Sequence, residues 1–214
     1  MPPFTTADLA ARRCWLFDMD GTLTVAMHDF DAMREALALP PGRPILETLA
    51  AMDPVERREK RAELDAMELQ MAGDAEPQPG AVALLEHLAA GGVRLGIVTR
   101  NGRDIADATL AACDLARFFP PPSIVSRDCA TAKPDPAGVN LAMERLGAGA
   151  DETVMVGDYL FDLQAGRDAG ALTVHVDVAG SFAWPAVTDI GVSSLHELLG
   201  RLGAGSFPAG STAD

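Results

Sequence analysis

Strand-length apolar runs alternate with helix-like segments over most of this chain, and no other feature constrains its fold so strongly. The runs are apolar throughout, as in strands buried on both faces, and they lie at residues 14–17, 93–98, 123–125, 153–156 and 172–176. Segments with apolar residues at spacings of three and four are predicted to be helices, at residues 81–90, 104–113, 136–146 and 161–169. This order predicts a doubly wound α/β domain, with helices on both faces of a parallel sheet.

Residues 25–79 interrupt this order, because they contain helical patterns but no strand-like run. We interpret them as a small helical cap inserted after the first strand. The α/β core is then expected to comprise residues 1–24 and 80–202, so that the chain leaves the core once and returns to it. Residues 203–214 are rich in Gly, Ala, Ser and Pro and are predicted to form a disordered tail.

One helix of the cap is predicted together with its ends. Asp53 is suited to cap it, Pro54 is favoured at the first helical position, and the helical pattern continues to Met71. Residues 56–61 carry charges of both signs. We interpret them as a solvated helix face with ion pairs between neighbours, in preference to a phosphate-binding basic patch.

Composition and charge exclude several classes of protein. No apolar run approaches the roughly 20 residues of a membrane-spanning helix, and the 31 acidic and 17 basic residues give a net charge of −14, which repels nucleic acid. Residues 1–13 lack the order of a secretory signal. The three cysteines form no CxxC pair, so neither a disulfide framework nor a zinc site is indicated. We expect a soluble cytoplasmic protein with neither membrane nor nucleic acid as a partner.

Two carboxylates follow the first predicted strand, in the sequence Asp18-Met19-Asp20-Gly21-Thr22. The carboxyl ends of parallel strands are where a doubly wound fold binds its ligands. Asp18 and Asp20 are two positions apart, so in extended backbone they can project toward one site, and Gly21 permits a tight turn beside them. Because Asp-Gly turns are common, the weight of this motif depends on the other strand ends.

Two further strand ends supply groups that can bind phosphate. Thr99 ends the second predicted strand, with Asn101 two positions later, and Lys133 follows the third strand. The prolines of Lys133-Pro134-Asp135-Pro136 restrict the backbone that carries the lysine. Since the whole chain is strongly acidic, a phosphate site needs local cations and amides, and these residues can provide them.

The fourth predicted strand ends in Gly157-Asp158, and Asp162 follows four positions later. Together with Asp18 and Asp20, these residues would form an acidic cluster at one edge of the sheet. Carboxylates that repel one another require a counterion, and oxygen ligands without a nearby Cys or His favour Mg²⁺.

In their order along the chain, these motifs resemble those of the haloacid dehalogenase-like hydrolase superfamily. The resemblance rests on Asp18-Met19-Asp20-Gly21-Thr22, Thr99, Lys133-Pro134, and Gly157-Asp158 with Asp162, and it covers about residues 12–180. It implies the phosphatase branch with a short helical cap of the first type, similar to phosphoglycolate phosphatases.

The resemblance implies a role for each reactive residue. Asp18 would attack phosphorus and form an aspartyl-phosphate, and Asp20 would act first as general acid and then as general base. Thr99, Asn101 and Lys133 would bind the phosphoryl oxygens, and Lys133 would also restrain Asp18. The expected reaction is hydrolysis of a small phosphorylated metabolite, a phosphomonoester.

The resemblance also implies Mg²⁺ as cofactor. The metal ligands would be the Asp18 and Asp158 carboxylates and the backbone carbonyl of Asp20, with Asp162 close by and acting through water. The metal and the lysine would screen the repulsion between an anionic nucleophile and an anionic phosphate.

Alternative functions remain open within and outside this superfamily. A dehalogenase would use Asp18 on carbon but has no use for Asp20, which argues against it. A sugar phosphomutase keeps the same motifs, and a non-catalytic metal- or phosphate-binding module would keep the fold. Tyr159 stands where relatives often carry a small hydroxyl residue, and His28 lies in a presumed flap near the site. No motif in the cap identifies the substrate, and none indicates an oligomeric state.

Overall fold

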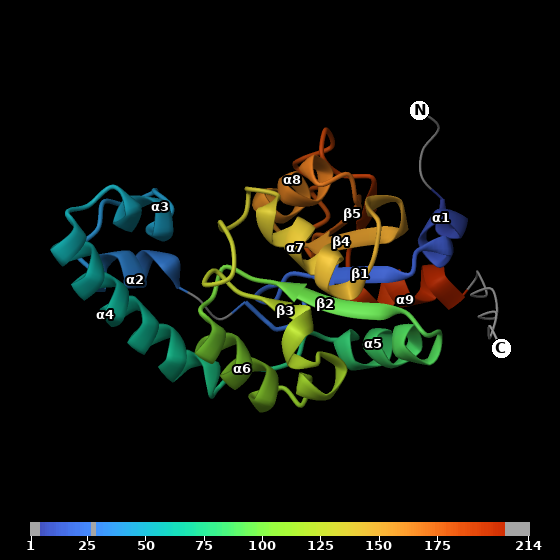
Figure 1. Cartoon of the computed structure of the whole chain (residues 1–214), viewed down its shortest axis with the longest axis horizontal. Coiled ribbons are helices and arrows are strands. Elements are labelled where there is room, and N and C mark those ends of the chain that lie inside the picture. The colour runs from blue at the N-terminus through green and yellow to red at the C-terminus, as the bar shows by residue number, and fades with distance from the viewer. Residues whose placement is uncertain (1–4, 27–28, 204–214) are drawn as a thin grey trace.

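A six-stranded parallel sheet forms the centre of the molecule (Figure 1). The computed structural model describes residues 5–26 and 29–203. The strand order is β3-β2-β1-β4-β5-β6, and the strands are β1 (Cys14–Phe17), β2 (Arg94–Val98), β3 (Ile124–Val125), β4 (Thr153–Gly157), β5 (Leu172–Val176) and β6 (Ile190–Val192). Because β1 lies between β2 and β4, the ends of these three strands meet at the middle of one sheet edge. The predicted α/β fold is confirmed.

Helices cover both faces of the sheet (Figure 1). One face carries α5 (Ala81–Ala90), α6 (Arg103–Ala112) and α9 (Leu195–Gly203), with α1 (Thr6–Ala11) beside α9, and the other carries α7 (Ala137–Leu146) and α8 (Leu160–Asp168). Side chains of β1 alternate between the two apolar layers, with Trp15 and Phe17 in one and Cys14 and Leu16 in the other. This double burial explains why the strand is apolar at every position. Three short 3₁₀ helices lie at Ala116–Phe118, Pro121–Ser123 and Ala150–Glu152.

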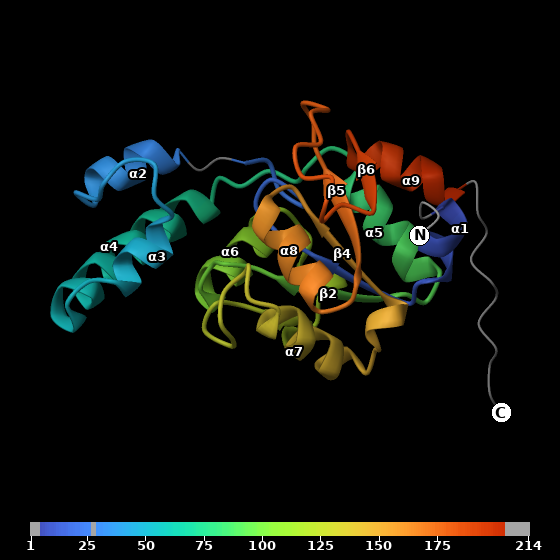
Figure 2. The ribbon, with the colours of Figure 1, turned by 90° about the horizontal axis from the view of Figure 1, so that it is seen from above.

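The helices between β1 and α5 form a cap to one side of the sheet (Figure 2). It contains α2 (Phe30–Ala36), α3 (Ile45–Ala50) and α4 (Pro54–Ala72). A separate apolar cluster holds these helices together, formed by Met33, Leu37, Leu39, Ile45, Leu49 and Leu64. The predicted start of α4 is confirmed, because the Asp53 side chain accepts a hydrogen bond from the backbone N of Val55, with Pro54 in the first turn.

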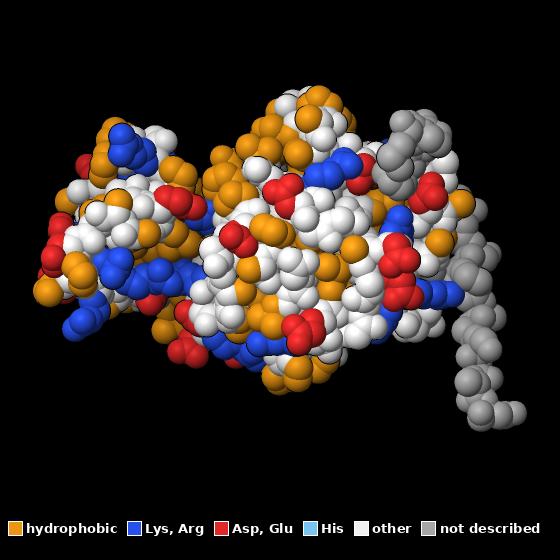
Figure 3. All heavy atoms as spheres, turned by 45° about the horizontal axis from the view of Figure 1, so that its top comes forward, with side chains coloured by type: hydrophobic (Ala, Val, Ile, Leu, Met, Phe, Trp, Pro, Cys, Tyr) orange, Lys and Arg blue, Asp and Glu red, His pale blue; other side chains and the backbone are white. Residues whose placement is uncertain are grey.

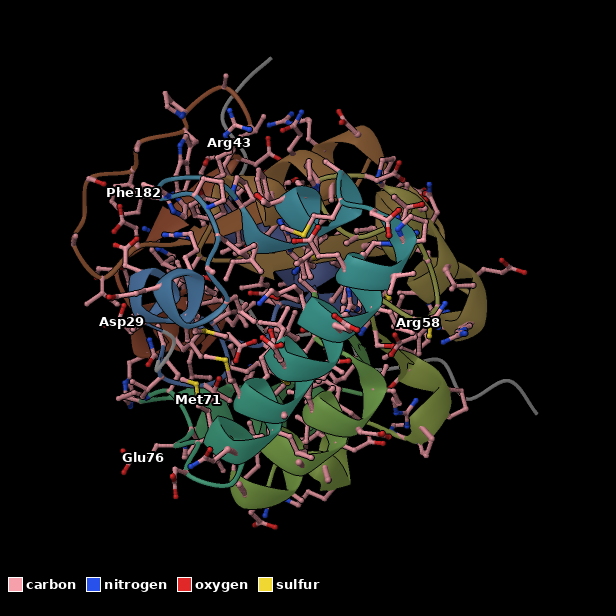
Figure 4. All side chains as sticks on the ribbon, turned by 90° about the vertical axis from the view of Figure 1, so that its left-hand side faces the viewer. Asp29, Arg43, Arg58, Met71, Glu76 and Phe182 are labelled. Carbon is pink, nitrogen blue, oxygen red and sulfur yellow. The ribbon has the colours of Figure 1, made fainter. Side chains whose placement is uncertain are left out.

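The charged face of α4 also agrees with the sequence prediction. Lys60 pairs with Glu63 and Arg61 with Asp65, both within the helix. Further along, α4 packs against α6 of the core. Figure 4 views the cap from outside, with Arg58 near one end of α4 and Met71 near the other, so that this helix crosses in front of the core.

Among the described α-helices and strands, α1, β6 and α9 were not predicted from the sequence. Helix α1 has 6 residues and β6 has 3, which is too short for a clear period. Helix α9 carries leucines at 195, 198, 199 and 202, a helical spacing that was available in the sequence. Gly203 of the predicted tail lies in α9, and residues 204–214 lie outside the described part of the chain. No helix among the described residues is long and apolar enough to cross a membrane.

Candidate active site

The parallel topology brings the predicted site residues to one edge of the sheet. Asp18 follows β1, Thr99 follows β2 and Asp158 follows β4, while Lys133 comes from the loop after β3. Since these strands are neighbours that run in the same direction, their carboxyl ends converge. The site therefore lies where the doubly wound fold leaves a crevice, facing the cap.

Lys133 is the centre of this cluster. The residue is only 2% exposed, and its Nζ lies 2.5 Å from Asp18 Oδ1 and 2.6 Å from Asp162 Oδ1. A buried ammonium is costly unless it is paired, and two carboxylates satisfy it here. Although burial acts in the opposite direction, Asp162 and Asp18 raise the pKa of Lys133, so the side chain is a permanent cation.

Carboxylates outnumber cations in the cluster. Burial, followed by the charge of Asp162, raises the pKa of Asp18 well above its ordinary range in spite of Lys133. Burial and the same neighbour raise the pKa of Asp158 to about 7. Burial is the larger cause of both shifts, and the carboxylate charge that Lys133 does not offset adds to it.

The donor set fits a hard divalent cation. Asp18, Asp158 and Asp162 each offer an oxygen, and these oxygens lie within 4.8 Å of one another. Gly21 leaves room for this arrangement, because a Cβ at that position would lie 2.4 Å from Asp158 Oδ2. Its φ of 85° also favours glycine. Thr22 Oγ1 donates a hydrogen bond of 3.1 Å to Asp158 Oδ1 and orients that carboxylate.

Asp20 accepts a hydrogen bond from the turn after β2. Asn101 Nδ2 donates a hydrogen bond of 2.7 Å to Asp20 Oδ2. The backbone N of Asn101 in turn donates to Thr99 Oγ1 at 3.1 Å, so the turn after β2 is itself fixed. Asp20 and Asn101 both line the cavity described below, whereas Thr99 is buried and is not among its lining residues.

A cavity of about 420 Å³ separates the cluster from the cap. Figure 3 shows the corresponding hollow between the two parts of the molecule. The core contributes the acidic cluster, Asp20, Asn101, the lysine and four residues that the sequence motifs give no role, Arg100, Arg127, Tyr159 and Phe161. The cap contributes Phe30, Arg34, Gly42, Arg43, Pro44, Ile45, Leu46, Leu64 and Glu68.

Two arginines of the core hold the cap over this cavity. Arg100 Nη2 lies 2.8 Å from both carboxylate oxygens of Glu47 on α3. Arg127 pairs with Glu68 of α4 at 3.0 Å and also with Asp65. The Arg100–Glu47 and Arg127–Glu68 partners are 53 and 59 residues apart in the sequence, so no local pattern could have identified them.

Comparison with known proteins identifies the family. A sequence profile of the family described as haloacid dehalogenase-like hydrolase matches residues 35–176. The chain belongs to this family. An uncharacterized hydrolase of Saccharomyces cerevisiae is 31% identical over 86% of this chain and 88% of its own length, which extends the similarity beyond the range of the profile. The expected resemblance is confirmed.

Other proteins that are similar to this chain have named activities. The N-acetylmuramic acid 6-phosphate phosphatase of Pseudomonas aeruginosa is 32% identical over 75% of this chain and 80% of its own. The phosphoglycolate phosphatase of Rhodospirillum rubrum is 29% identical over 88% of each chain. The crystal structure of a hydrolase from Pseudomonas syringae superposes with a TM-score of 0.76 at 25% identity, covering 90% of this chain and 99% of that one.

The structure thus places the predicted site residues in two groups. Asp18, Asp158, Asp162 and Lys133 form the cluster, while Asp20 and Asn101 form a hydrogen-bonded pair beside it. Thr22 was missed, although it belongs to the first motif and its hydroxyl is a ready donor to a carboxylate. His28 lies outside the described residues.

Proposed function

We propose that this hydrolase is a Mg²⁺-dependent phosphatase that hydrolyses a phosphomonoester through an aspartyl-phosphate on Asp18. The observation that carries the proposal is the buried Lys133 between Asp18 and Asp162, beside an Asp20 that is oriented separately by Asn101. This arrangement offers one carboxylate held for attack and a second one, oriented by Asn101, for proton transfer. The phosphatases among its relatives add support.

In the first half-reaction, an Asp18 carboxylate oxygen forms a bond to phosphorus while the bond between phosphorus and the ester oxygen breaks. Asp20 gives its proton to the departing oxygen, so the leaving group departs as an alcohol. Lys133 keeps Asp18 oriented and offsets the charge of the phosphoryl group.

In the second half-reaction, Asp20 is a carboxylate and accepts a proton from water. The water oxygen bonds to phosphorus, the bond to Asp18 breaks, and phosphate is released with Asp18 restored. Asn101 holds Asp20 in place for both proton transfers. The cap excludes bulk water from the cavity during the first transfer.

The metal site of the proposal consists of the Asp18 and Asp158 carboxylates and the backbone carbonyl of Asp20, with Asp162 close by. Thr22 and Gly21 keep Asp158 in position, the one by a hydrogen bond and the other by having no Cβ. When bound, Mg²⁺ supplies positive charge that lowers the repulsion between carboxylate and phosphate.

Phosphate release from a generic alkyl phosphate, with and without exhaustive chelation, tests the proposal. We expect release in Mg²⁺, loss of release after chelation and recovery when Mg²⁺ is returned. Full activity after chelation would contradict the metal-dependent mechanism. Release of phosphate would also separate hydrolysis from phosphomutase chemistry, which transfers the group back to a sugar. A panel of phosphorylated metabolites that includes phosphoglycolate and N-acetylmuramic acid 6-phosphate would then rank substrates.

A further inference from the structure

The cavity beside the acidic cluster contains an aromatic ring that the reaction itself does not require. Tyr159 directly follows Asp158 and lines the cavity, yet the residue is 51% exposed. It is the one tyrosine of the sequence. Tyrosine combines a large apolar ring with a polar hydroxyl and is therefore enriched at surfaces that contact a partner. An exposed ring at the mouth of a reactive site therefore suggests contact with a ligand.

The surrounding structure holds this ring in one orientation. Its centroid lies 5.1 Å from that of Phe161 and 5.2 Å from that of Trp184, both in edge-to-face geometry. Trp184 packs in turn on His175, at 5.0 Å between centroids. The backbone N of Tyr159 donates to Asp162 Oδ2 at 3.0 Å, which ties the ring to the acidic cluster. A ring fixed before binding loses little conformational freedom when a ligand packs on it.

The opposite wall of the cavity is also apolar. Phe30 at the start of α2 is 53% exposed and lines the cavity from the cap. The cap adds further apolar side chains, those of Pro44, Ile45, Leu46 and Leu64. Figure 3 shows hydrophobic side chains gathered on the part of the core that faces the hollow. Away from the phosphate site, a ligand would therefore meet mainly aromatic and aliphatic surface.

Most of the arginines that line the cavity form ion pairs with carboxylates of the protein. Arg34 pairs with Asp31, Arg100 with Glu47, and Arg127 with Asp65 and Glu68. Arg43 also lines the cavity, and its guanidinium has no ion-pair partner among the described residues. It provides the competing hypothesis, in which the substrate carries a second anionic group in place of an apolar one.

We propose that the leaving group of the substrate carries a planar aromatic ring, and that Tyr159 is the residue that selects it by packing against that ring. This inference rests on the phosphatase function proposed above. The size of the cavity supports it, because about 420 Å³ lies within the range of sites for drug-sized ligands and far exceeds the needs of a phosphate. Tyr159 acts as a specificity-determining residue, and the acidic cluster performs the reaction.

Steady-state kinetics with benzyl phosphate and ethyl phosphate test the inference, because both are alkyl esters with alcohols of similar basicity. We expect Tyr159→Ala to raise KM for benzyl phosphate by about tenfold and to leave KM for ethyl phosphate within about twofold. Tyr159→Phe should retain the wild-type preference, since the ring and not the hydroxyl makes the contact. Val178→Ala is the matched control, because Val178 is 73% exposed and lies outside the cavity lining.

A measurement on the wild-type chain tests the inference without requiring that a variant folds. Protein labelled with 3-fluorotyrosine should give one ¹⁹F signal, since the sequence has one tyrosine. In Mg²⁺, benzylphosphonate should shift that signal clearly more than ethylphosphonate does. Equal shifts with the two phosphonates would overturn the inference.

Two kinetic outcomes would also overturn it. One is an equal loss for benzyl and ethyl phosphate in Tyr159→Ala. The other is a higher kcat/KM for phosphoglycolate than for benzyl phosphate that depends on Arg43 and not on Tyr159, which would favour the second anionic group. If the proposed phosphatase function is wrong, the results differ from these. Benzyl phosphate, ethyl phosphate and phosphoglycolate would then all release no phosphate, whereas benzylphosphonate would still shift the ¹⁹F signal.

Discussion

Asn101 Nδ2 donates a hydrogen bond of 2.7 Å to Asp20 Oδ2, across the gap between the turns after β2 and β1. The sequence motifs predict phosphate binding for Asn101, and the structure adds a role in positioning the proposed general acid. The two roles predict different kinetics. A group that orients Asp20 matters most when the departing oxygen needs a proton, whereas a phosphate ligand matters for every ester.

We therefore predict that Asn101→Ala lowers the rate of phosphoenzyme formation from an alkyl phosphate by about tenfold and lowers that from nitrophenyl phosphate much less. Single-turnover kinetics of both esters provide the measurement. Asn140→Ala on α7 is the matched control, because Asn140 is exposed and is not among the residues that line the cavity. Equal losses for the two esters would assign Asn101 to phosphate binding alone.

Asp20→Asn should show the same discrimination more strongly. The amide can neither donate the required proton nor accept one from water, but the backbone carbonyl proposed to bind the metal is unchanged. We expect a large loss of phosphoenzyme formation with alkyl esters, a smaller loss with nitrophenyl phosphate, and an unchanged Mg²⁺ affinity. If both esters lose the same factor in phosphoenzyme formation, Asp20 is not the acid.

Lys133→Met should lower the free energy of unfolding by about 3 kcal/mol, because it leaves Asp18 and Asp162 buried without their cation. Urea denaturation followed by circular dichroism measures this change. Lys60→Met is the control, since Lys60 pairs with Glu63 at the surface and such a pair contributes about 1 kcal/mol or less. Equal effects of the two substitutions would mean that the buried pairs add no special stability.

Gly21→Ala should weaken Mg²⁺ binding, because a Cβ at this position would lie 2.4 Å from Asp158 Oδ2. Calorimetric titration with Mg²⁺ provides the measurement. Gly92→Ala separates this contact from backbone strain, since Gly92 also has a positive φ, of 69°, but its added Cβ would meet nothing within 4 Å. Both variants should lose about 1 kcal/mol of stability, and only Gly21→Ala should lose metal affinity. Normal affinity in Gly21→Ala would show that Asp158 can move without cost.

The core of the fold and the acidic cluster could be predicted because both depend on short-range patterns. Strands buried on both faces are apolar at every position, and parallel strands place their carboxyl ends together, so the amino-acid sequence alone assigns Asp18, Lys133 and Asp158 to one site. Helix α4 could be predicted from Asp53 and Pro54 for the same reason. The division into core, cap and tail at the predicted residues stays a prediction.

The residues that shape the cavity could not be predicted, because they depend on how the cap lies on the core. Nothing in the sequence around Glu47 or Arg100 indicates that they meet. Tyr159 was recognisable as a departure from the family pattern, but the orientation of its ring depends on packing against Trp184, which lies 25 positions further along the chain. Substrate selection therefore depends on contacts that short-range patterns do not encode.

The location of the phosphoryl group after the first transfer decides most directly whether Asp18 is the nucleophile. Asp20→Asn should let the intermediate accumulate when nitrophenyl phosphate is the substrate, since the base for the second step is lost. Acid quenching, proteolysis and fragmentation by mass spectrometry then locate the modification. The proposed mechanism predicts a phosphoryl group on Asp18, and none in the double variant with Asp18→Asn. A phosphoryl group on any other residue, or nitrophenol and phosphate released together with no modified Asp18, would contradict it.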